Sequence, residues 1–289
     1  MMTTGLWIRH AAGLACAVAV CADCSSADPA RLENDACAVV SGPKPLTNLP
    51  EASGAALSRR TAGILWTHND SGQPVLFAFD ANAALRGRVR VPNAAVDDWE
   101  DVSAARCPAG NCLYIADIGD NNESRQQITV YRLAEPQPND TESGPAEIFT
   151  ATYPDGAHDA EALFVVNDAI YVLTKGPSTV MYRFPATLRI GATMPLERVA
   201  ELPLKRVTDA ETSSDGAWVT VRNGEEVAFY RAADITRGGT AAITVPLGTL
   251  NEPQGEGVAL DASGTLYLTS EGDGAGSMRT LRCTLPQSG

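Results

Sequence analysis

Short apolar stretches alternate with turn residues along most of the chain. Runs such as AEALFVV, AIYVLTKG and TVMYRFP contain β-branched and aromatic residues, and Gly, Asn, Asp or Ser residues separate them. Apolar runs of this length, bounded by turn signals, are typical of β-strands. With 25 Gly and 18 Pro in 289 residues, the composition also favours a chain rich in turns. The pattern predicts an all-β protein.

The strands belong to a cassette that recurs five times: an acidic residue, a small or apolar run, a tight turn, and an apolar strand with an aromatic residue. Its acidic positions are Glu51, Glu100, Glu161, Glu211 and Glu256, which are separated by 49, 61, 50 and 45 residues. Repeats of about 40 to 50 residues with several strands each are typical of β-propellers. We therefore predict a five-bladed β-propeller. A six-bladed ring is the alternative, and it would need a further repeat within the 61-residue gap.

The last repeat ends before its fourth strand. Residues 36–49 precede the first repeat and have no partner within it, so they can supply that strand. The ring would then close through an N-terminal strand in the last blade, which removes an exposed sheet edge. Residues 37–289 are predicted to form this single domain, with Cys37 beside Cys283.

The N-terminal 22 residues resemble a secretory signal peptide. Arg9 and His10 precede an apolar core of about ten residues, too short to span a membrane. Cleavage after Ala22 would leave residues 23–36 as a polar tether. A lipid anchor on Cys21 or Cys24 is the alternative. Either signal predicts an exported protein, periplasmic or extracellular, without a transmembrane span.

Export permits disulfide bonds, and two pairs are predicted. Cys107 and Cys112 flank the turn of one hairpin, where cross-strand Cβ atoms approach each other. Cys37 and Cys283 form the second pair, because a propeller brings the two ends of its chain together. The alternative is that these cysteines are buried free thiols.

The chain has a net charge of −13. Nucleic-acid binding depends on clustered Lys and Arg residues, so this class of partner is excluded. We expect a monomer that binds a small molecule or a component of the cell envelope.

The acidic residues of the cassettes are predicted to surround the propeller axis, because the first strand of each blade lines the channel. Strand starts also supply other acids, among them Asp98, Asp101 and Asp209. Crowded carboxylates repel one another unless they bind protons or a cation. Oxygen ligands without thiolates suit Ca²⁺, with Mg²⁺ as second choice. We predict Glu100, Glu161, Glu211 and Glu256 as ligands. The alternative is a water-filled channel whose acids bond to backbone amides.

Four residues are candidates for catalysis on the same face. His68 and His158 could act as general bases, and Lys175 and Arg222 could stabilise negative charge. A Ca²⁺-dependent hydrolase of a phosphoester or lactone is one hypothesis. The other is a binding protein in which Ca²⁺ is structural. Whether the protein is an enzyme stays open.

Four segments resemble the inner strands of known secreted propellers: DWEDVS, HDAEALF, TDAETSS and EPQGEGVALDASGTLYLTSEG. They are similar to those of β-propeller phytases, esterase-like phytase relatives and calcium-activated nucleotidases. In the nucleotidases, glutamates of the blades surround a central Ca²⁺, and this resemblance implies the same role for Glu100, Glu161, Glu211 and Glu256. The channel face has few cations, which does not fit a highly phosphorylated substrate.

Overall fold

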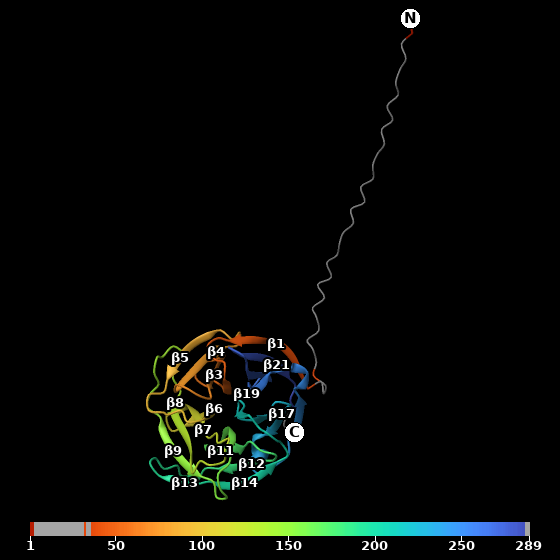
Figure 1. Cartoon of the computed structure of the whole chain (residues 1–289). Coiled ribbons are helices and arrows are strands. Elements are labelled where there is room, and N and C mark those ends of the chain that lie inside the picture. Colours follow the sequence, from red (N-terminus) through yellow and green to blue (C-terminus); the bar gives the residue numbers. More distant parts are fainter. Residues whose placement is uncertain (3–31, 33–35, 287–289) are drawn as a thin grey trace.

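The computed structural model describes residues 1–2, 32 and 36–286. These residues form five small sheets arranged as blades around one axis (Figure 1). The five-bladed β-propeller prediction is confirmed. Residues 3–22 of the predicted signal peptide and most of the tether lie outside the described residues. Within the part of the chain that is described, no helix is both long and apolar enough to cross a membrane.

Each blade has four antiparallel strands, numbered from the axis outward. Blade 1 contains β2 (Ala52–Leu57), β3 (Ile64–Asn69), β4 (Val75–Asp80) and β5 (Leu85–Arg90). Blade 2 contains β6 (Trp99–Cys107), β7 (Gly110–Asp117), β8 (Ile128–Ala134) and β9 (Glu147–Thr152). Blade 3 contains β10 (Ala160–Val166), β11 (Ala169–Thr174), β12 (Thr179–Arg183) and β14 (Glu197–Leu202). Blade 4 contains β15 (Asp209–Thr212), β16 (Trp218–Arg222), β17 (Glu226–Arg231) and β18 (Ile243–Pro246).

Blade 5 combines the two ends of the chain. It contains β19 (Gln254–Leu260), β20 (Thr265–Glu271) and β21 (Gly276–Cys283), with β1 (Cys37–Leu46) as its outer strand. The predicted closure is confirmed, since β1 pairs antiparallel with β21 and Cys37 is bonded to Cys283 (Figure 1). This disulfide joins residues 246 positions apart. By restricting the unfolded chain, it stabilises the closed ring.

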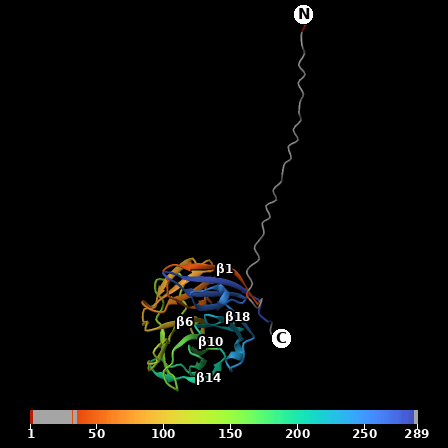
Figure 2. The same cartoon turned by 45° about the vertical axis from the view of Figure 1, so that its right-hand side comes forward.

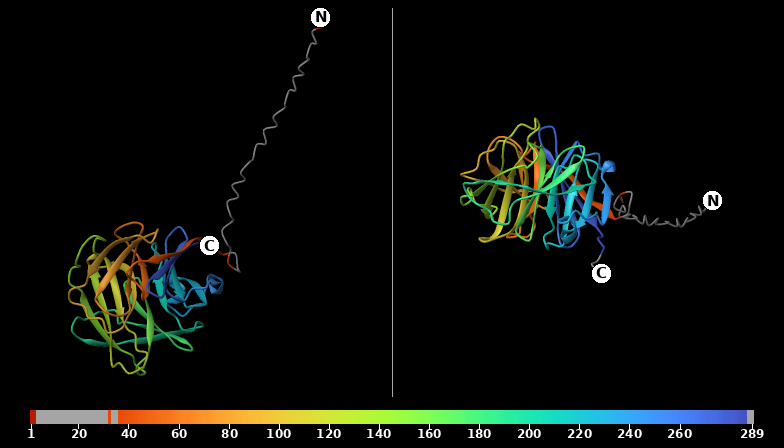
Figure 3. Two further views of the ribbon diagram at one scale, coloured as in Figure 1. Left: turned by 45° about the horizontal axis from the view of Figure 1, so that its top comes forward. Right: turned by 90° about the horizontal axis from the view of Figure 1, so that it is seen from below.

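Hydrophobic side chains fill the five spaces between neighbouring blades. The second strand of each blade contributes one aromatic ring to a different cluster: Trp66, Tyr114, Tyr171, Trp218 and Tyr267. The aromatic end of the cassette is therefore used for packing between blades. In Figure 2, β6 and β10 lie nearer the middle of the ring than β14, and Figure 3 shows the ring from two further directions. The first strands thus surround the axis.

Several elements depart from the plain repeat. A short strand, β13 (Thr193–Pro195), leaves blade 3 and pairs in parallel with β9 of blade 2. The chain also forms α1 (Ala232–Ile235) and the 3-10 turn η1 (Gly248–Leu250). The strand β13 was not predicted, because its pairing partner belongs to another repeat.

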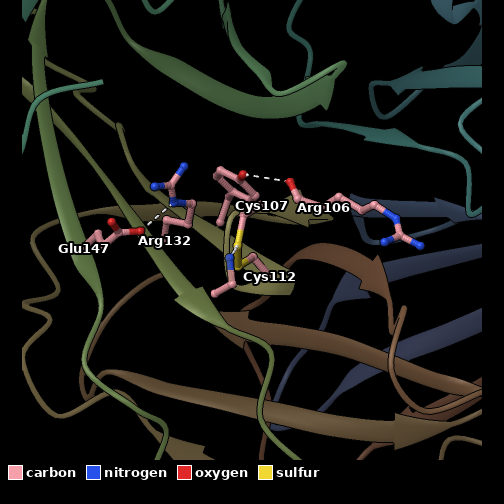
Figure 4. Close-up of a disulfide and its surroundings, with 7 residues drawn as sticks. Arg106, Cys107, Cys112, Arg132 and Glu147 are labelled. Atoms are coloured by element: carbon pink, nitrogen blue, oxygen red, sulfur yellow. Dashed lines mark hydrogen bonds and ion pairs between the residues drawn. A yellow bond between two sulfur atoms is a disulfide. The ribbon is translucent and has the colours of Figure 1, made fainter. Parts of the chain in front are cut away.

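The predicted disulfide between Cys107 and Cys112 is confirmed. It joins β6 to β7 beside the hairpin turn (Figure 4). On the neighbouring strands, Arg132 forms an ion pair of 2.7 Å with Glu147. This bridge fixes the end of one hairpin, whereas the Cys37–Cys283 bridge closes the whole ring.

Candidate functional site

A β-bulge interrupts the first strand of four blades near its start. The pairing register shifts between Trp99 and Asp101 in β6, which makes Glu100 the extra residue. The same shift occurs around Glu161 in β10. Related shifts in β2 and β19 occur across the stretches that contain Ser53 and Glu256. A bulge changes the direction of a side chain, so these residues are turned out of the regular alternation.

The four bulge residues line one chamber of about 160 Å³ at the mouth of the axis. Polar groups form nearly all of its wall. Six carboxylates line it: Asp70, Asp98, Glu100, Glu161, Glu256 and Glu271. Lys175 is the one cation among the lining residues. Three of the four glutamates predicted as metal ligands therefore lie together, and the chamber is strongly acidic.

Burial makes ionisation of the deepest carboxylates costly. It raises the pKa of Glu100 to about 11, with further contributions from the neighbouring charges of Glu161 and Asp98. Burial also raises the pKa of Glu161 to about 8, although Lys175 opposes this shift. Because a buried carboxylate needs a proton or a positive partner, this chamber favours any cation that can enter.

Lys175 supplies the positive partner. It follows the last residue of β11, and its Nζ donates a hydrogen bond to Glu161 Oε1. Burial disfavours the charge of Lys175, but the carboxylates of Glu161, Glu256 and Glu100 outweigh this effect and raise its pKa. The ammonium group therefore stays charged and neutralises part of the chamber.

Two outer carboxylates have pKa values close to neutrality. The pKa of Glu271 is raised to about 7 by burial and by the charges of Glu256, Asp70 and Glu51. Burial and Glu51 raise the pKa of Asp70 to about 6. Both residues are half-buried, and their charge therefore changes with pH near neutrality.

Glu211, the fourth predicted ligand, does not join this group. The pairing of β15 with β16 runs without a bulge, so Glu211 keeps the regular alternation of its strand. Its carboxylate accepts hydrogen bonds from the hydroxyl of Ser103 and the backbone N–H of Ala104 in blade 2. Here the alternative, an acid bonded to backbone amides, is what the structure shows. The sequence TDAETSS resembles HDAEALF, but a missing bulge places its glutamate elsewhere.

Deeper in the channel, the carboxyl groups of Asp101 and Asp209 interact electrostatically, and among the described residues neither Oδ1 atom has a hydrogen-bond partner. Both are fully buried, and burial raises both pKa values. Asp101 Oδ2 accepts from the N–H of Leu163, and Asp209 Oδ2 accepts from those of Ala55 and Val258. These five residues belong to five different blades. The axial pair therefore ties the whole ring together.

Sequence reasoning missed this axial pair. It placed Asp101 and Asp209 at the mouth, because both lie at the start of a first strand. Their depth follows from the strand register, which the local sequence does not reveal. The one signal was that DWEDVS and TDAETSS contain further acids beside the cassette glutamate.

Arg59 lies at the far end of the channel. Its Nε donates to the carbonyl of Ala104, and its two terminal nitrogens donate to the carbonyls of Ser214 and Ser213. These contacts join the loop of blade 1 to blades 2 and 4. The far end is thus occupied by a guanidinium group, while the mouth is acidic.

Neither predicted histidine lines the chamber. His68 is fully buried against Trp99, and burial lowers its pKa to about 4. The imidazole of His158 is bonded to Asp155 and to the hydroxyl of Tyr182, 3.0 Å away in each case. His68 is therefore a neutral residue of the interior, and His158 belongs to a surface cluster beside the mouth.

Arg222 is also enclosed. Its side chain is fully buried and pairs with Glu252 at 2.9 Å. Nη1 donates to the carbonyls of Gly257 and Thr269 in blade 5. Arg222 thus bridges blades 4 and 5, and of the four predicted catalytic residues only Lys175 faces the chamber.

The chamber offers oxygen donors suited to a hard cation, but these donors do not form a closed coordination shell. Across residues 36–286 and the other described positions, no three His, Cys, Asp or Glu side chains lie in a metal-binding arrangement. Lys175 instead contacts Glu161 inside the chamber. The chamber therefore offers oxygen donors of the type that hard divalent cations prefer, arranged around an ammonium group.

Comparison with known proteins agrees with the fold. The chain is similar to the PQQ-bound aldose sugar dehydrogenase of Streptomyces coelicolor, with a TM-score of 0.51, 11% identity, and coverage of 85% of this chain and 97% of that one. It is also similar to the apo soluble aldose sugar dehydrogenase of Escherichia coli, with a TM-score of 0.47, 10% identity, and coverage of 83% and 99%. A gluconolactonase of Xanthomonas campestris gives a TM-score of 0.44, 14% identity, and coverage of 87% and 91%.

The likeness to the Streptomyces coelicolor enzyme agrees with the β-propeller fold. At 11% identity it shows the fold alone. No protein-family model matches the chain, and no curated protein matches it. The function must therefore be argued from the chamber itself.

Proposed function

We propose that the protein is a β-propeller binding protein whose mouth chamber takes a hard divalent cation, Ca²⁺ before Mg²⁺. One observation carries this proposal: six carboxylates line about 160 Å³, and a single ammonium group accompanies them. A doubly charged cation would neutralise more of this charge than one lysine does. The raised pKa values of Glu100 and Glu161 measure the imbalance that the cation would relieve.

Glu100, Glu161 and Glu256 would hold the cation. Their oxygens come from three separate blades, so their spacing can adjust, and Ca²⁺ tolerates variable geometry and ligand number better than Mg²⁺ does. Gly119 contacts the carboxylates of Glu100 and Asp98 so closely that a Cβ atom would clash with both. Once bound, the cation would supply a positive centre that attracts an anionic or polar ligand.

The setting that we propose is the exported space, with a ligand of small-molecule or cell-envelope origin at the channel face. The two disulfides support an oxidising compartment. The acidic surface around the chamber argues against anionic polymers as partners.

Binding fits the geometry better than hydrolysis. Among the described residues that line the chamber there is no histidine, and Arg222 has its donors engaged in blade 5. A positioned general base and a group that stabilises developing charge are what hydrolysis would require.

The cation is tested by thermal unfolding of the purified protein with EDTA and with added Ca²⁺. A ligand at about 100 times its Kd stabilises the folded state by about 2.7 kcal/mol, which raises Tm by several degrees. The double variant Glu161→Gln with Glu256→Gln should lose this shift. The matched control, Glu142→Gln with Glu197→Gln, removes the same charge from exposed ion pairs and should keep it. An unchanged Tm in the wild-type protein would exclude the cation.

One observation supports the alternative function, a Ca²⁺-dependent hydrolase. Glu271 faces the chamber with a pKa of about 7, the value that suits a general base near neutral pH. A Ca²⁺-dependent hydrolase would use this residue. A panel of aryl phosphate, nucleotide and lactone substrates with Ca²⁺ tests it, and activity that disappears in Glu271→Gln would favour the hydrolase over the binding protein.

A further inference from the structure

Lys175 stands at the junction of two hollows. One is the acidic chamber, where its ammonium group is bonded to Glu161. The other is a groove of about 400 Å³ between blades 3, 4 and 5, lined on its far side by Arg206, Asn223 and Gly224. Lys175, Gln254 and Glu256 line both hollows, so the lysine can reach either without crossing protein.

Lys175 differs in charge from the residues at the corresponding position of blades 1 and 5. Residues that follow the corresponding second strands include Asp70 in blade 1, and Glu271 ends the second strand of blade 5. Both are carboxylates that line the chamber. Blade 3 instead places an ammonium group on a flexible four-carbon stem at this point. The side chain is 31% exposed, while Glu161 is 6% exposed.

We infer that Lys175 is a tethered counter-ion that competes with the external cation for Glu161 and moves toward the groove when the cation binds. The inference rests on the proposed function and adds its regulation. In the cation-free protein the ammonium group occupies the chamber. An entering cation must break the Lys175–Glu161 ion pair, and the groove provides the space into which the side chain moves.

The groove can receive the displaced ammonium group. Besides Lys175 and Glu256, three charged residues line it. Arg206 and Glu225 form an exposed ion pair of 2.9 Å, and Glu252 is bonded to Arg222. The exposed pair is weak because water screens it. Glu225 can therefore exchange Arg206 for Lys175. Cation binding would leave two basic groups beside the chamber, where an anionic part of a ligand could be held.

Calorimetric titration of Ca²⁺ into three proteins tests the competition. Lys175→Met should bind Ca²⁺ about tenfold more tightly than the wild type, since no ion pair at a partly buried site has to be broken. Arg206→Met is the matched control, because it removes a cation from the same groove but not from Glu161. It should change the affinity by less than about threefold, since exposed charges are screened.

A second readout follows the lysine itself. Acetylation of Lys175 by acetic anhydride, quantified by mass spectrometry, should become faster when Ca²⁺ is added, because the ammonium group leaves Glu161 for a more exposed place. Exposed Lys205, on the same face, should show no change. If Lys175 is acetylated at the same rate or more slowly with Ca²⁺, the displacement is excluded.

The outcomes separate the two proposals. If wild type and Lys175→Met bind Ca²⁺ equally, the chamber binds the cation but Lys175 does not compete. If Lys175→Met binds and the wild type does not, the competition is supported and the proposed function of the wild-type protein fails. If neither binds, both proposals fail. Lys175→Gln serves as a second variant, and Tm without metal confirms that each protein is folded.

Discussion

The mouth and the middle of the channel contain the same kind of residue in opposite situations. At the mouth, Glu100 and Glu161 depend on one ammonium group and on protons for compensation. In the middle, the carboxylate oxygens of Asp209 and Glu211 accept hydrogen bonds from backbone N–H groups of other blades. The first set is poorly compensated, and the second is bonded within the fold.

This difference distinguishes a binding site from a set of residues that hold the blades together. Backbone N–H groups cannot leave, so the carboxylates that they bind hold the blades in place. The charge at the mouth can be compensated by something that enters and leaves. Acidic residues around a propeller axis are therefore not equivalent, and the donors that face them decide which role each one has.

The largest expected effect comes from the axial pair. Asp209→Ala would leave the N–H groups of Ala55 and Val258 without an acceptor in a fully buried place. Each unsatisfied donor costs about 1–3 kcal/mol, so we expect a loss of about 4 kcal/mol in the free energy of unfolding. Urea denaturation measures it. Glu271→Ala, at the mouth, is the control and should lose less than about 1 kcal/mol. Equal losses in both variants would remove the distinction between the two regions.

A smaller effect should differ in sign between the regions. Glu211→Gln places an amide N–H₂ group where the carboxylate accepts from Ser103 and Ala104, and should destabilise the metal-free protein by about 1–3 kcal/mol. Glu100→Gln replaces a buried carboxyl group, whose raised pKa favours the neutral form, by a neutral amide, and should be neutral or stabilising without metal. Paired denaturation curves in EDTA compare the two. Destabilisation of similar size in both variants would mean that Glu100 also holds the blades together.

The sequence predicted the fold because the repeat is a local signal. The five cassettes, the unpaired N-terminal strand and the cysteines Cys37 and Cys283 each pointed to the same closed ring, and the structure agrees. Aromatic residues at one position of each second strand indicated the packing between blades. Such features recur within each repeat, so they can be recognised without knowing the tertiary structure.

The site was predicted only in part, because direction and depth depend on register. Glu161 and Glu211 stand in similar sequences, yet a bulge occurs in β10 and none in β15. His68 lies at the end of a second strand, as predicted, but its ring turns into the space beside Trp99. One inserted or missing residue in a strand reverses the face of a side chain, and this is decided by pairing across the blade.

The smallest expected effect is a pH dependence of Tm that arises from the carboxyl groups at the mouth. The folded-state pKa values of Glu271 and Asp70, about 7 and about 6, lie above those of the unfolded chain. The folded state therefore binds more protons between these values, so its stability is fully present below about pH 4 and is lost as pH rises through 6 and 7. In EDTA, Tm should fall from pH 5 to pH 8 by about 3 °C.

Two comparisons test whether this change of Tm with pH arises at the mouth. The double variant Asp70→Asn with Glu271→Gln should lose part of the fall in Tm, because it no longer releases those two protons. Added Ca²⁺ should also flatten the slope in the wild type, since a cation in the chamber favours the ionised carboxylates. The axial pair of Asp101 and Asp209 also has raised pKa values and contributes a slope of the same sign. Burial also raises the pKa of Glu211 to about 8. A fall in Tm that neither the variant nor Ca²⁺ reduces would therefore place the pH dependence at the buried acids Asp101, Asp209 and Glu211 instead of the mouth.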